Sequence, residues 1–316
     1  MAELTDHVDL ASERLGGTVI EANDEFFAEK HNILKPAVPV FVPGKYTDRG
    51  KWMDGWETRR RRTPGHDWCV VRLGVAGMLH GIDVDTSHFT GNYPSHCSLD
   101  AAGEDMSWVE VLHRSLLQGG SHNLFSIENP TRFTHVRLNI YPDGGVARLR
   151  VYGEALPDFD ALKPPFDLAA VENGGQVLAA SDMFFGSRHN LILPGHSTHM
   201  GDGWETKRRR GPGYDWVIVR LGTTGLVERI DVETDHFKGN YPESCSIDAC
   251  HAPGVIVEDL SIGRVSWTEI VARTKLDADS RRRLTVAGGP FTHVRLNIYP
   301  DGGVSRLRVL GSRLLL

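Results

Sequence analysis

The chain has 316 residues, and its 35 lysines and arginines against 41 aspartates and glutamates give a net charge of −6. This acidic balance argues against nucleic acid as the main partner, because binding to phosphates needs a surplus of basic residues. With 40% hydrophobic and 24% charged residues, the composition is that of a globular protein rather than a disordered one. The length predicts about two domains of roughly 150 residues each.

The N-terminal segment gives no sign of export. Residues 1–17 are acidic and contain no long apolar run, so we predict no secretory signal. Charged residues such as Arg72 and Arg220 interrupt the apolar stretches early, so we expect no membrane span and no membrane partner. We therefore expect a soluble, cytoplasmic protein.

Short elements follow one another in the first third of the chain. Residues 22–33 predict a short helix, and residues 68–74 (WCVVRLG) form a β-branched run that is typical of a strand. In residues 82–86 (IDVDT) apolar and acidic residues alternate, so we expect a strand whose Asp83 and Asp85 point outward.

The next elements are a turn at 91–94 (GNYP) and a second short helix at 107–117. Residues 134–141 (THVRLNIY) alternate with a period of two, which predicts a strand with one core face and one polar face. A turn at 142–145 (PDGG) leads into another strand at 146–153. Many short strands joined by turns favour an all-β fold, an antiparallel β-sandwich or jelly roll.

The chain is an internal repeat. Four blocks recur in the same order: 16–33 as 174–191, 54–74 as 202–222, 82–101 as 230–249, and 133–146, without a change, as 291–304. The second copy therefore repeats the same predicted strands and a short helix at 181–191. Each copy is long enough to bury its own core, so the repeat predicts duplicated domains rather than a solenoid.

The offset between the copies is 158 at both ends of the repeat and 148 in the middle. The first copy thus has ten extra residues between positions 34 and 54, and the second has ten extra between 249 and 291. Both insertions are expected to be loops, which tolerate changes in length. A proline-rich linker at 155–167 separates the domains, which we place at 1–156 and 157–316.

The cysteines indicate buried thiols. Cys69, Cys97, Cys245 and Cys250 are too few for a disulfide scaffold of this size. Cys245, Cys250 and His251 lack a second ligand pair at a recognised spacing, which disfavours a zinc site.

Three of the repeated blocks resemble those of the allantoicase family: DGWETRRRR…DW…VRLG, DTSHFTGNYP and THVRLNIYPDGG. The resemblance extends over residues 16–153 and 174–311. It implies two duplicated jelly-roll domains akin to galactose-binding modules. It also implies hydrolysis of a small ureide, allantoate, to ureidoglycolate and urea in allantoin degradation and purine metabolism, by an enzyme that forms homo-oligomers.

A site for allantoate needs a cation for the carboxylate, and arginine suits it because its planar fork makes two parallel bonds. The candidate substrate-binding residues are Arg72, Arg220, Arg137 and Arg295. Alternatively, these arginines pair with neighbouring carboxylates and join strands within a sheet.

The same site needs an acid for the departing nitrogen and a base for water. Histidine titrates near working pH, and the candidates are His88 and His236 before the GNYP turn and His135 and His293 on the polar strand face. Alternatively, each of these histidines makes only structural hydrogen bonds.

Carboxylates flank a repeated tryptophan. Glu57 and Glu205, with Asp54 and Asp202 close by in the sequence, would have raised pKa values in a dry site and could activate water, or they could be turn carboxylates. Asn92 and Asn240 in the GNYP turns could hydrogen-bond a ureido group or supply turn geometry. In the predicted mechanism an arginine holds the substrate, a histidine protonates the departing urea and Glu57 or Glu205 activates water.

Basic runs at Arg59–Arg62 and Lys207–Arg210 indicate a solvated loop, a subunit interface or a cationic surface that draws an anionic substrate toward a nearby site. The sequence has no spaced metal-ligand cluster, so no cofactor is assigned, and activation by a divalent metal is left open. The alternative function is a tandem galactose-binding-like module without catalysis, because this fold has many binding roles.

The two halves differ at some positions within the repeated blocks, which raises a third alternative in which only one half is catalytic. His66 is replaced by Tyr214 and Asp85 by Glu233, so these positions would mark the active half.

Overall fold

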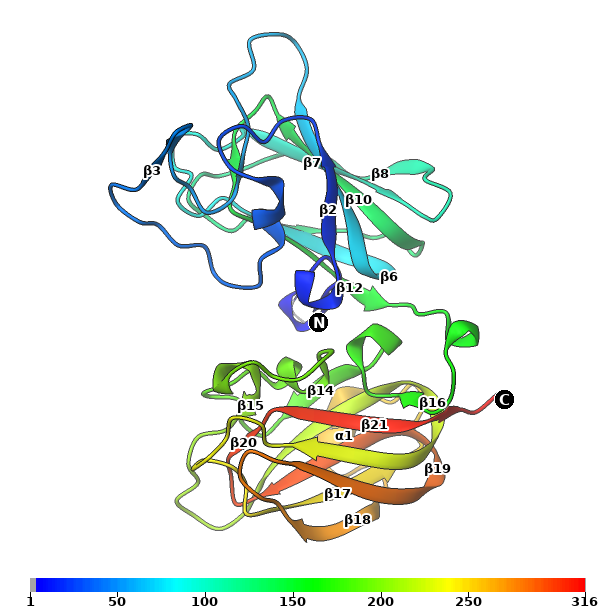
Figure 1. Cartoon of the computed structure of the whole chain (residues 1–316). Helices are drawn as coiled ribbons and strands as arrows, with labels where there is room; N and C mark the ends of the chain where they lie inside the picture. Colours follow the sequence, from blue (N-terminus) through cyan, green and yellow to red (C-terminus); the bar gives the residue numbers. More distant parts are fainter. Residues whose placement is uncertain (1–3, 316) are drawn as a thin grey trace. The chain divides into compact units, whose positions relative to one another are not determined.

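The chain folds as two units, Met1–Pro157 and Asp158–Leu316, in a computed structural model that describes residues 4–315. Each unit contains one copy of the repeat and consists almost entirely of strands and connecting loops (Figure 1). The prediction of an all-β protein with two duplicated jelly-roll domains is confirmed.

The first unit is a network of antiparallel strands in the order β1-β12-β6-β10-β7-β8, with β2 and β9 also paired to β6. The bounds are β1 Val8–Asp9, β2 Thr18–Ala22, β6 Asp67–Asp85, β7 His96–Ala102, β8 Trp108–Leu116, β9 Leu124–Ser126, β10 Arg132–Tyr141 and β12 Arg148–Ala155. A separate short pair joins β5 (Trp56–Glu57) to β11 (Gly145–Val146).

The long strand β6 connects the two layers of the sandwich. Its first part, residues 67–72, pairs with β10 and β2, residues 77–78 pair with both β10 and β12, and residues 79–85 pair with β12 and β9. The alternation predicted for β10 is confirmed, since its apolar side chains are fully buried between the layers: Val136, Leu138 and Ile140.

The two aspartates of the IDVDT segment do not point into solvent, so that prediction is wrong. Asp83 and Asp85 are 5% and 2% exposed. Asp83 accepts from Asn123 N at 3.1 Å, just before β9, which pairs with β6, and Asp85 accepts from the nearby Ser87 N at 2.8 Å. Alternation indicated the correct strand, but backbone donors at its end and from a neighbouring segment bind its acidic side chains in buried positions.

The second unit repeats this arrangement in the order β13-β21-β16-β19-β17-β18, with β14 on β16. The bounds are β13 Phe166–Asp167, β14 Gln176–Ala180, β16 Asp215–Glu233, β17 Ser244–Cys250, β18 Thr268–Lys275, β19 Arg281–Tyr299 and β21 Arg306–Arg313. A short pair joins β15 (Trp204–Glu205) to β20 (Gly303–Val304).

The helix predictions are largely wrong. Only single 3-10 turns form in the first predicted helix of each copy, at Lys30–Leu34 and Arg188–Ile192. The third predicted helix, 107–117, is strand β8, which pairs with β7. Its apolar spacing is ambiguous over so short a run, and pairing with a sheet edge decided the outcome.

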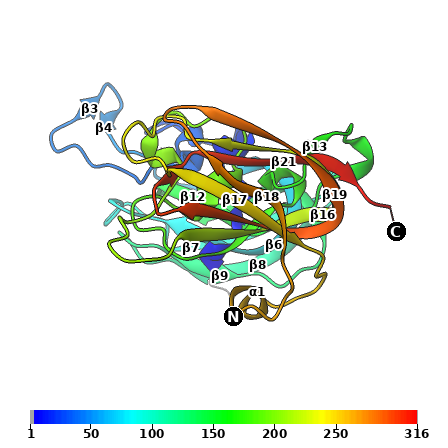
Figure 2. The ribbon, with the colours of Figure 1, turned by 90° about the horizontal axis from the view of Figure 1, so that it is seen from below.

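The ten-residue insertions lie outside the sandwich strands. In the first copy the inserted chain ends in a small hairpin, β3 (Tyr46–Thr47) with β4 (Gly50–Lys51), which stands out from the ribbon in Figure 2. In the second copy it contains α1 (Val257–Ser261), the only α-helix in residues 4–315.

All four cysteines are buried and free, as the sequence analysis predicted. None of the helices between residues 4 and 315 has the length and apolar content needed to span a membrane.

Candidate active site

The DGWET motif anchors a loop in each unit. Trp56 is fully buried, and its indole nitrogen donates to Asp24 O at 2.8 Å. Asp54 forms a buried ion pair with Arg148, with Oδ2 and Nη2 2.7 Å apart. Burial acts to raise the pKa of Asp54, but the bonds from Arg148 and Val40 outweigh it and lower the pKa. Asp54 is therefore a structural carboxylate.

The second unit has the same anchoring contacts. Trp204 is buried and donates to Asp182 O at 2.8 Å, and Arg306 contacts Asp202 at 3.1 Å. The glutamate that follows each tryptophan is thereby fixed at the edge of the sandwich by β5 and by β15.

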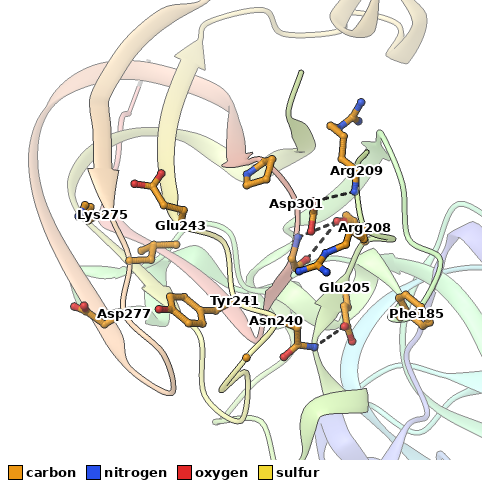
Figure 3. A pocket seen from close by; sticks show the side chains of 15 residues that line it. Phe185, Glu205, Arg208, Arg209, Asn240, Tyr241, Glu243, Lys275, Asp277 and Asp301 are labelled. Atoms are coloured by element: carbon orange, nitrogen blue, oxygen red, sulfur yellow. Dashed lines mark hydrogen bonds between the residues drawn. The ribbon is translucent and has the colours of Figure 1, made fainter. Parts of the chain in front are cut away.

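An open pocket lies beside this glutamate in each unit, with volumes of about 400 Å³ in the first and about 650 Å³ in the second. Equivalent residues line the two pockets. In the first unit they are Glu57, Arg60, Arg61, Asn92, Tyr93 and Asp143. In the second they are Glu205, Arg208, Arg209, Asn240, Tyr241 and Asp301, and Figure 3 shows that they come from separate loops.

The pocket glutamate is held by the asparagine of the GNYP turn. Asn92 Nδ2 donates to Glu57 Oε1 at 2.7 Å, and Asn240 donates to Glu205 at 2.5 Å. Burial raises the pKa of Glu57, while the bond from Asn92 and the nearby Lys51 act in the opposite direction. The structure thus brings together two of the predicted pairs of residues, the glutamates and the turn asparagines.

The basic runs supply two different arginines to each pocket. Arg61 is held in place, because its backbone N–H donates to Asp143 at 2.8 Å and its Nη1 lies 3.3 Å from Asp67. Arg209 is held in the same way by Asp301 and Asp215.

The neighbouring arginines are free to bind a ligand. Arg60 and Arg208 line the pockets, are exposed, and have no carboxylate partner within residues 4–315. From the sequence, one role expected of these runs was to draw an anionic substrate toward a nearby site, but neither Arg60 nor Arg208 was singled out. The sequence did contain a signal for these two arginines. Each basic run precedes an aspartate, Asp67 or Asp215, which can pair with one arginine of the run and leave its neighbour without a carboxylate partner.

The four arginines predicted to bind the carboxylate lie outside the pocket linings. Arg137 pairs with Asp100 at 2.8 Å and stacks on the Trp108 ring at 5.1 Å, and Arg295 pairs with Asp248 at 2.7 Å. These residues match the alternative in which an arginine joins neighbouring strands.

The remaining predicted arginines lie on β6 and β16. Arg72 Nη2 contacts Gly16 O at 3.4 Å, and Arg72 is opposite His135 in the strand register. Arg220 is likewise opposite His293.

The predicted histidines also lie outside the two pockets. His135 and His293 each hydrogen-bond the preceding threonine hydroxyl, at 2.8 Å and 2.9 Å. Burial lowers the pKa of His293 to about 4, with a smaller contribution from Arg220. His88 and His236 have φ near +71° and contact the carbonyl oxygens of Pro39 and Ser197 at 3.2 Å and 2.9 Å. They hold loops together.

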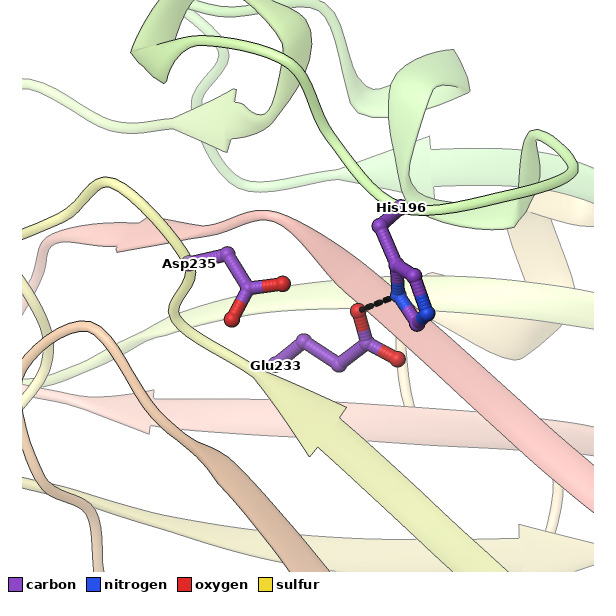
Figure 4. Close-up of side chains that lie close together, drawn as sticks. All are labelled: His196, Glu233 and Asp235. Atoms are coloured by element: carbon purple, nitrogen blue, oxygen red, sulfur yellow. Dashed lines mark hydrogen bonds and ion pairs between the residues drawn. The ribbon is translucent and has the colours of Figure 1, made fainter.

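A separate cluster in the second unit offers metal-ligand atoms. His196, Glu233 and Asp235 lie within 4.8 Å of one another (Figure 4), and they are the only such group among residues 4–315. Arg281 is bound to this cluster, with Nη2 2.9 Å from Asp235 and Nη1 3.1 Å from His196. A guanidinium therefore already neutralises one of the two negative charges, and a divalent ion fits these residues only if Arg281 moves.

The comparisons with known proteins agree on one family. A family model described as an allantoicase repeat matches residues 8–156 and 166–314. A probable allantoicase 1 from Burkholderia mallei is 50% identical, covering 97% of this chain and 94% of that protein. The Dictyostelium discoideum allantoicase is 46% identical, covering 95% and 86%. The crystal structure of allantoicase from Saccharomyces cerevisiae has 37% identity and a TM-score of 0.81, covering 96% of this chain and 92% of that one.

Proposed function

The chain belongs to the allantoicase family and hydrolyses allantoate to ureidoglycolate and urea, and we propose that it does so in the pockets around Glu57 and Glu205. One observation supports this location above the others. In both units a partly buried carboxylate, fixed by an asparagine amide, lines the same pocket as an arginine without a carboxylate partner in the described chain.

Allantoate has a carboxylate and two ureido groups on one carbon. The fork of Arg60 or Arg208 binds the carboxylate with two parallel charge-assisted hydrogen bonds. The amide of Asn92 or Asn240 donates to the glutamate, and its own carbonyl oxygen is then oriented to accept an N–H from a ureido group. The substrate is thereby placed with its central carbon beside the glutamate.

The glutamate performs both proton transfers. It removes a proton from water, whose oxygen forms a bond to the central carbon. The bond from that carbon to one ureido nitrogen breaks, and the electron pair stays on nitrogen. The protonated glutamate then gives its proton to that nitrogen, so urea leaves and ureidoglycolate remains. Burial raises the pKa of Glu57, which brings it closer to the operating pH and suits a group that accepts and returns a proton.

Urea release from allantoate by the purified protein tests this proposal. Replacing both catalytic glutamates (Glu57→Gln with Glu205→Gln) should lower kcat by about a hundredfold or more, the usual contribution of a general acid–base group. The control is Glu128→Gln, an exposed carboxylate outside both pockets. Full activity in the double variant would place the reaction elsewhere, and sugar binding without urea release would favour the non-catalytic module.

We further propose that the protein is a cytoplasmic homo-oligomer. Exposed apolar side chains in the second unit support subunit contacts, since Phe184 and Phe185 are 71% and 63% exposed. Light scattering after size exclusion measures the subunit number, and a monomer at micromolar concentration would contradict this part of the proposal.

A further inference from the structure

The two pockets share one wall and differ in the other. The shared wall has the glutamate, the free arginine and the asparagine described above. The opposite wall of the second pocket has three charged residues, Glu243, Lys275 and Asp277. In Figure 3 these three lie across the pocket from Arg208, with the Tyr241 ring between them.

Backbone contacts identify the residues that replace this charged wall in the first unit. Leu276 N donates to Glu243 O at 3.1 Å, and the same contact in the first unit joins Leu117 to Ser95 at 3.0 Å. Glu243 therefore corresponds to Ser95.

The other two equivalences follow in the same way. Lys275 is opposite Ser244 in the register of β17, and Leu116 is opposite His96 in the register of β7. Asp277 O accepts from a threonine hydroxyl, as does Gln118 O. The first unit thus has Ser95, Leu116 and Gln118 where the second has Glu243, Lys275 and Asp277, and of these three only Ser95 lines the first pocket.

The charged wall is partly held in place. Arg273 Nη2 contacts Glu243 at 2.9 Å, and Arg273 stacks on the Tyr299 ring. Lys275 has no ion pair within residues 4–315 and is therefore free to bind. The larger volume of this pocket, about 650 Å³ against about 400 Å³, leaves space between the two walls.

The chemistry of this wall matches a ureido group. Such a group has three N–H donors and one carbonyl acceptor, so carboxylates and an ammonium group complement it. In the first unit the equivalent serine and glutamine can form only neutral hydrogen bonds, and the leucine side chain forms none.

We propose that the second pocket is the principal allantoate site, in which Glu243, Lys275 and Asp277 bind the ureido group that is retained in the product. This inference rests on the proposed function of Glu57 and Glu205. The three residues determine specificity and do not take part in the bond-breaking step. The first pocket, without them, binds allantoate more weakly.

Steady-state kinetics with one pocket inactivated at a time test whether the second pocket has the higher kcat/KM for allantoate. Glu57→Gln leaves only the second pocket and should keep most of the wild-type kcat/KM. Glu205→Gln leaves only the first and should lose about tenfold or more, the worth of one charge-assisted hydrogen bond. Equal kcat/KM in the two variants would overturn the inference, whereas full activity in the double glutamate variant would instead refute the proposed function.

Exchanging the walls tests the three residues. In the Glu57→Gln background, Glu243→Ser with Lys275→Leu and Asp277→Gln should raise KM by about tenfold or more while kcat changes much less. The reverse exchange, Ser95→Glu with Leu116→Lys and Gln118→Asp in the Glu205→Gln background, should lower KM. This second set guards against loss through misfolding, and an unchanged KM in both sets would refute the role of the wall.

Discussion

The side-chain amide of Asn92 donates to Oε1 of Glu57 at 2.7 Å, so two residues that are 35 positions apart in the sequence meet on one wall of the first pocket. The amide fixes the direction of a carboxylate whose pKa is raised by burial. A carboxylate held in this way can face a substrate without rotating away from it. The second unit reproduces the relationship between Asn240 and Glu205.

Removing this amide should move the pH profile of the first pocket. In the Glu205→Gln background, Asn92→Ala removes a hydrogen bond that lowers the pKa of Glu57, so the pKa rises further. The base then needs a higher pH to be ionised, and the acidic limb of kcat/KM against pH should shift upward. Asn240→Ala in the same background is the control and should cause no shift. A limb that stays in place would show that Glu57 does not control the rate.

The pocket arginines and the strand arginines should differ in their effect on substrate binding. Arg60→Gln with Arg208→Gln should raise KM for allantoate by about tenfold or more, because a charge-assisted bond is lost. Arg137→Gln with Arg295→Gln should leave KM within about twofold, because those guanidinium groups are bound to Asp100 and Asp248. If the second double variant instead raised KM more than the first, the substrate carboxylate would have to bind at the strand face.

The buried ion pair beneath the loop should contribute strongly to stability. Arg148→Met leaves Asp54 charged and only 8% exposed, so the free energy of unfolding in guanidinium chloride should fall by about 3 kcal/mol. The matched control is Arg59→Met, which removes an exposed partner of Asp24 and should leave the unfolding midpoint near that of the parent. Similar midpoints for the two variants would contradict this assignment.

His293 should make the protein less stable in acid. Its pKa falls from the ordinary 6.5 to about 4 because the ring is buried. Between these values the unfolded chain binds a proton that the folded chain does not, so stability is lost as pH falls from 7 to 4. The loss is at most about 1.4 kcal/mol per pH unit.

Thermal unfolding measured between pH 4 and pH 7 checks this dependence. His293→Gln should flatten the fall in melting temperature, whereas His113→Gln, at a site whose side chain is 93% exposed, should not. An equally steep fall in the His293 variant would assign the acid sensitivity to other groups.

Divalent metal should contribute little to the hydrolysis. The described metal-ligand cluster, His196 with two carboxylates, already binds the guanidinium of Arg281. We therefore expect EDTA treatment to change kcat/KM by less than about twofold, since Arg281 occupies the space that a metal ion would need. Strong stimulation by added Mn²⁺ that His196→Ala abolishes would instead identify this cluster as an activating site.

Much of the fold could be derived from the sequence, because the relevant signals are local. The alternation in residues 134–141 corresponds to β10, and the duplicated blocks indicated the two units. Residues 107–117 were misassigned because the spacing of apolar residues fits either a helix or a strand over so short a run. Pairing with β7 decided that this segment is a strand, and local residue preferences do not encode that contact.

The sequence by itself determined that the chain is an acidic, duplicated β-protein with paired glutamates, asparagines and basic runs. Only the tertiary structure decided which of these residues meet. The loop of Glu57 and the turn of Asn92 converge on one pocket, whereas Arg137 is taken up by Asp100 on the adjacent strand. Such convergence depends on contacts between distant segments, and on which charges are already neutralised by a buried partner, and neither is visible in the order of the residues.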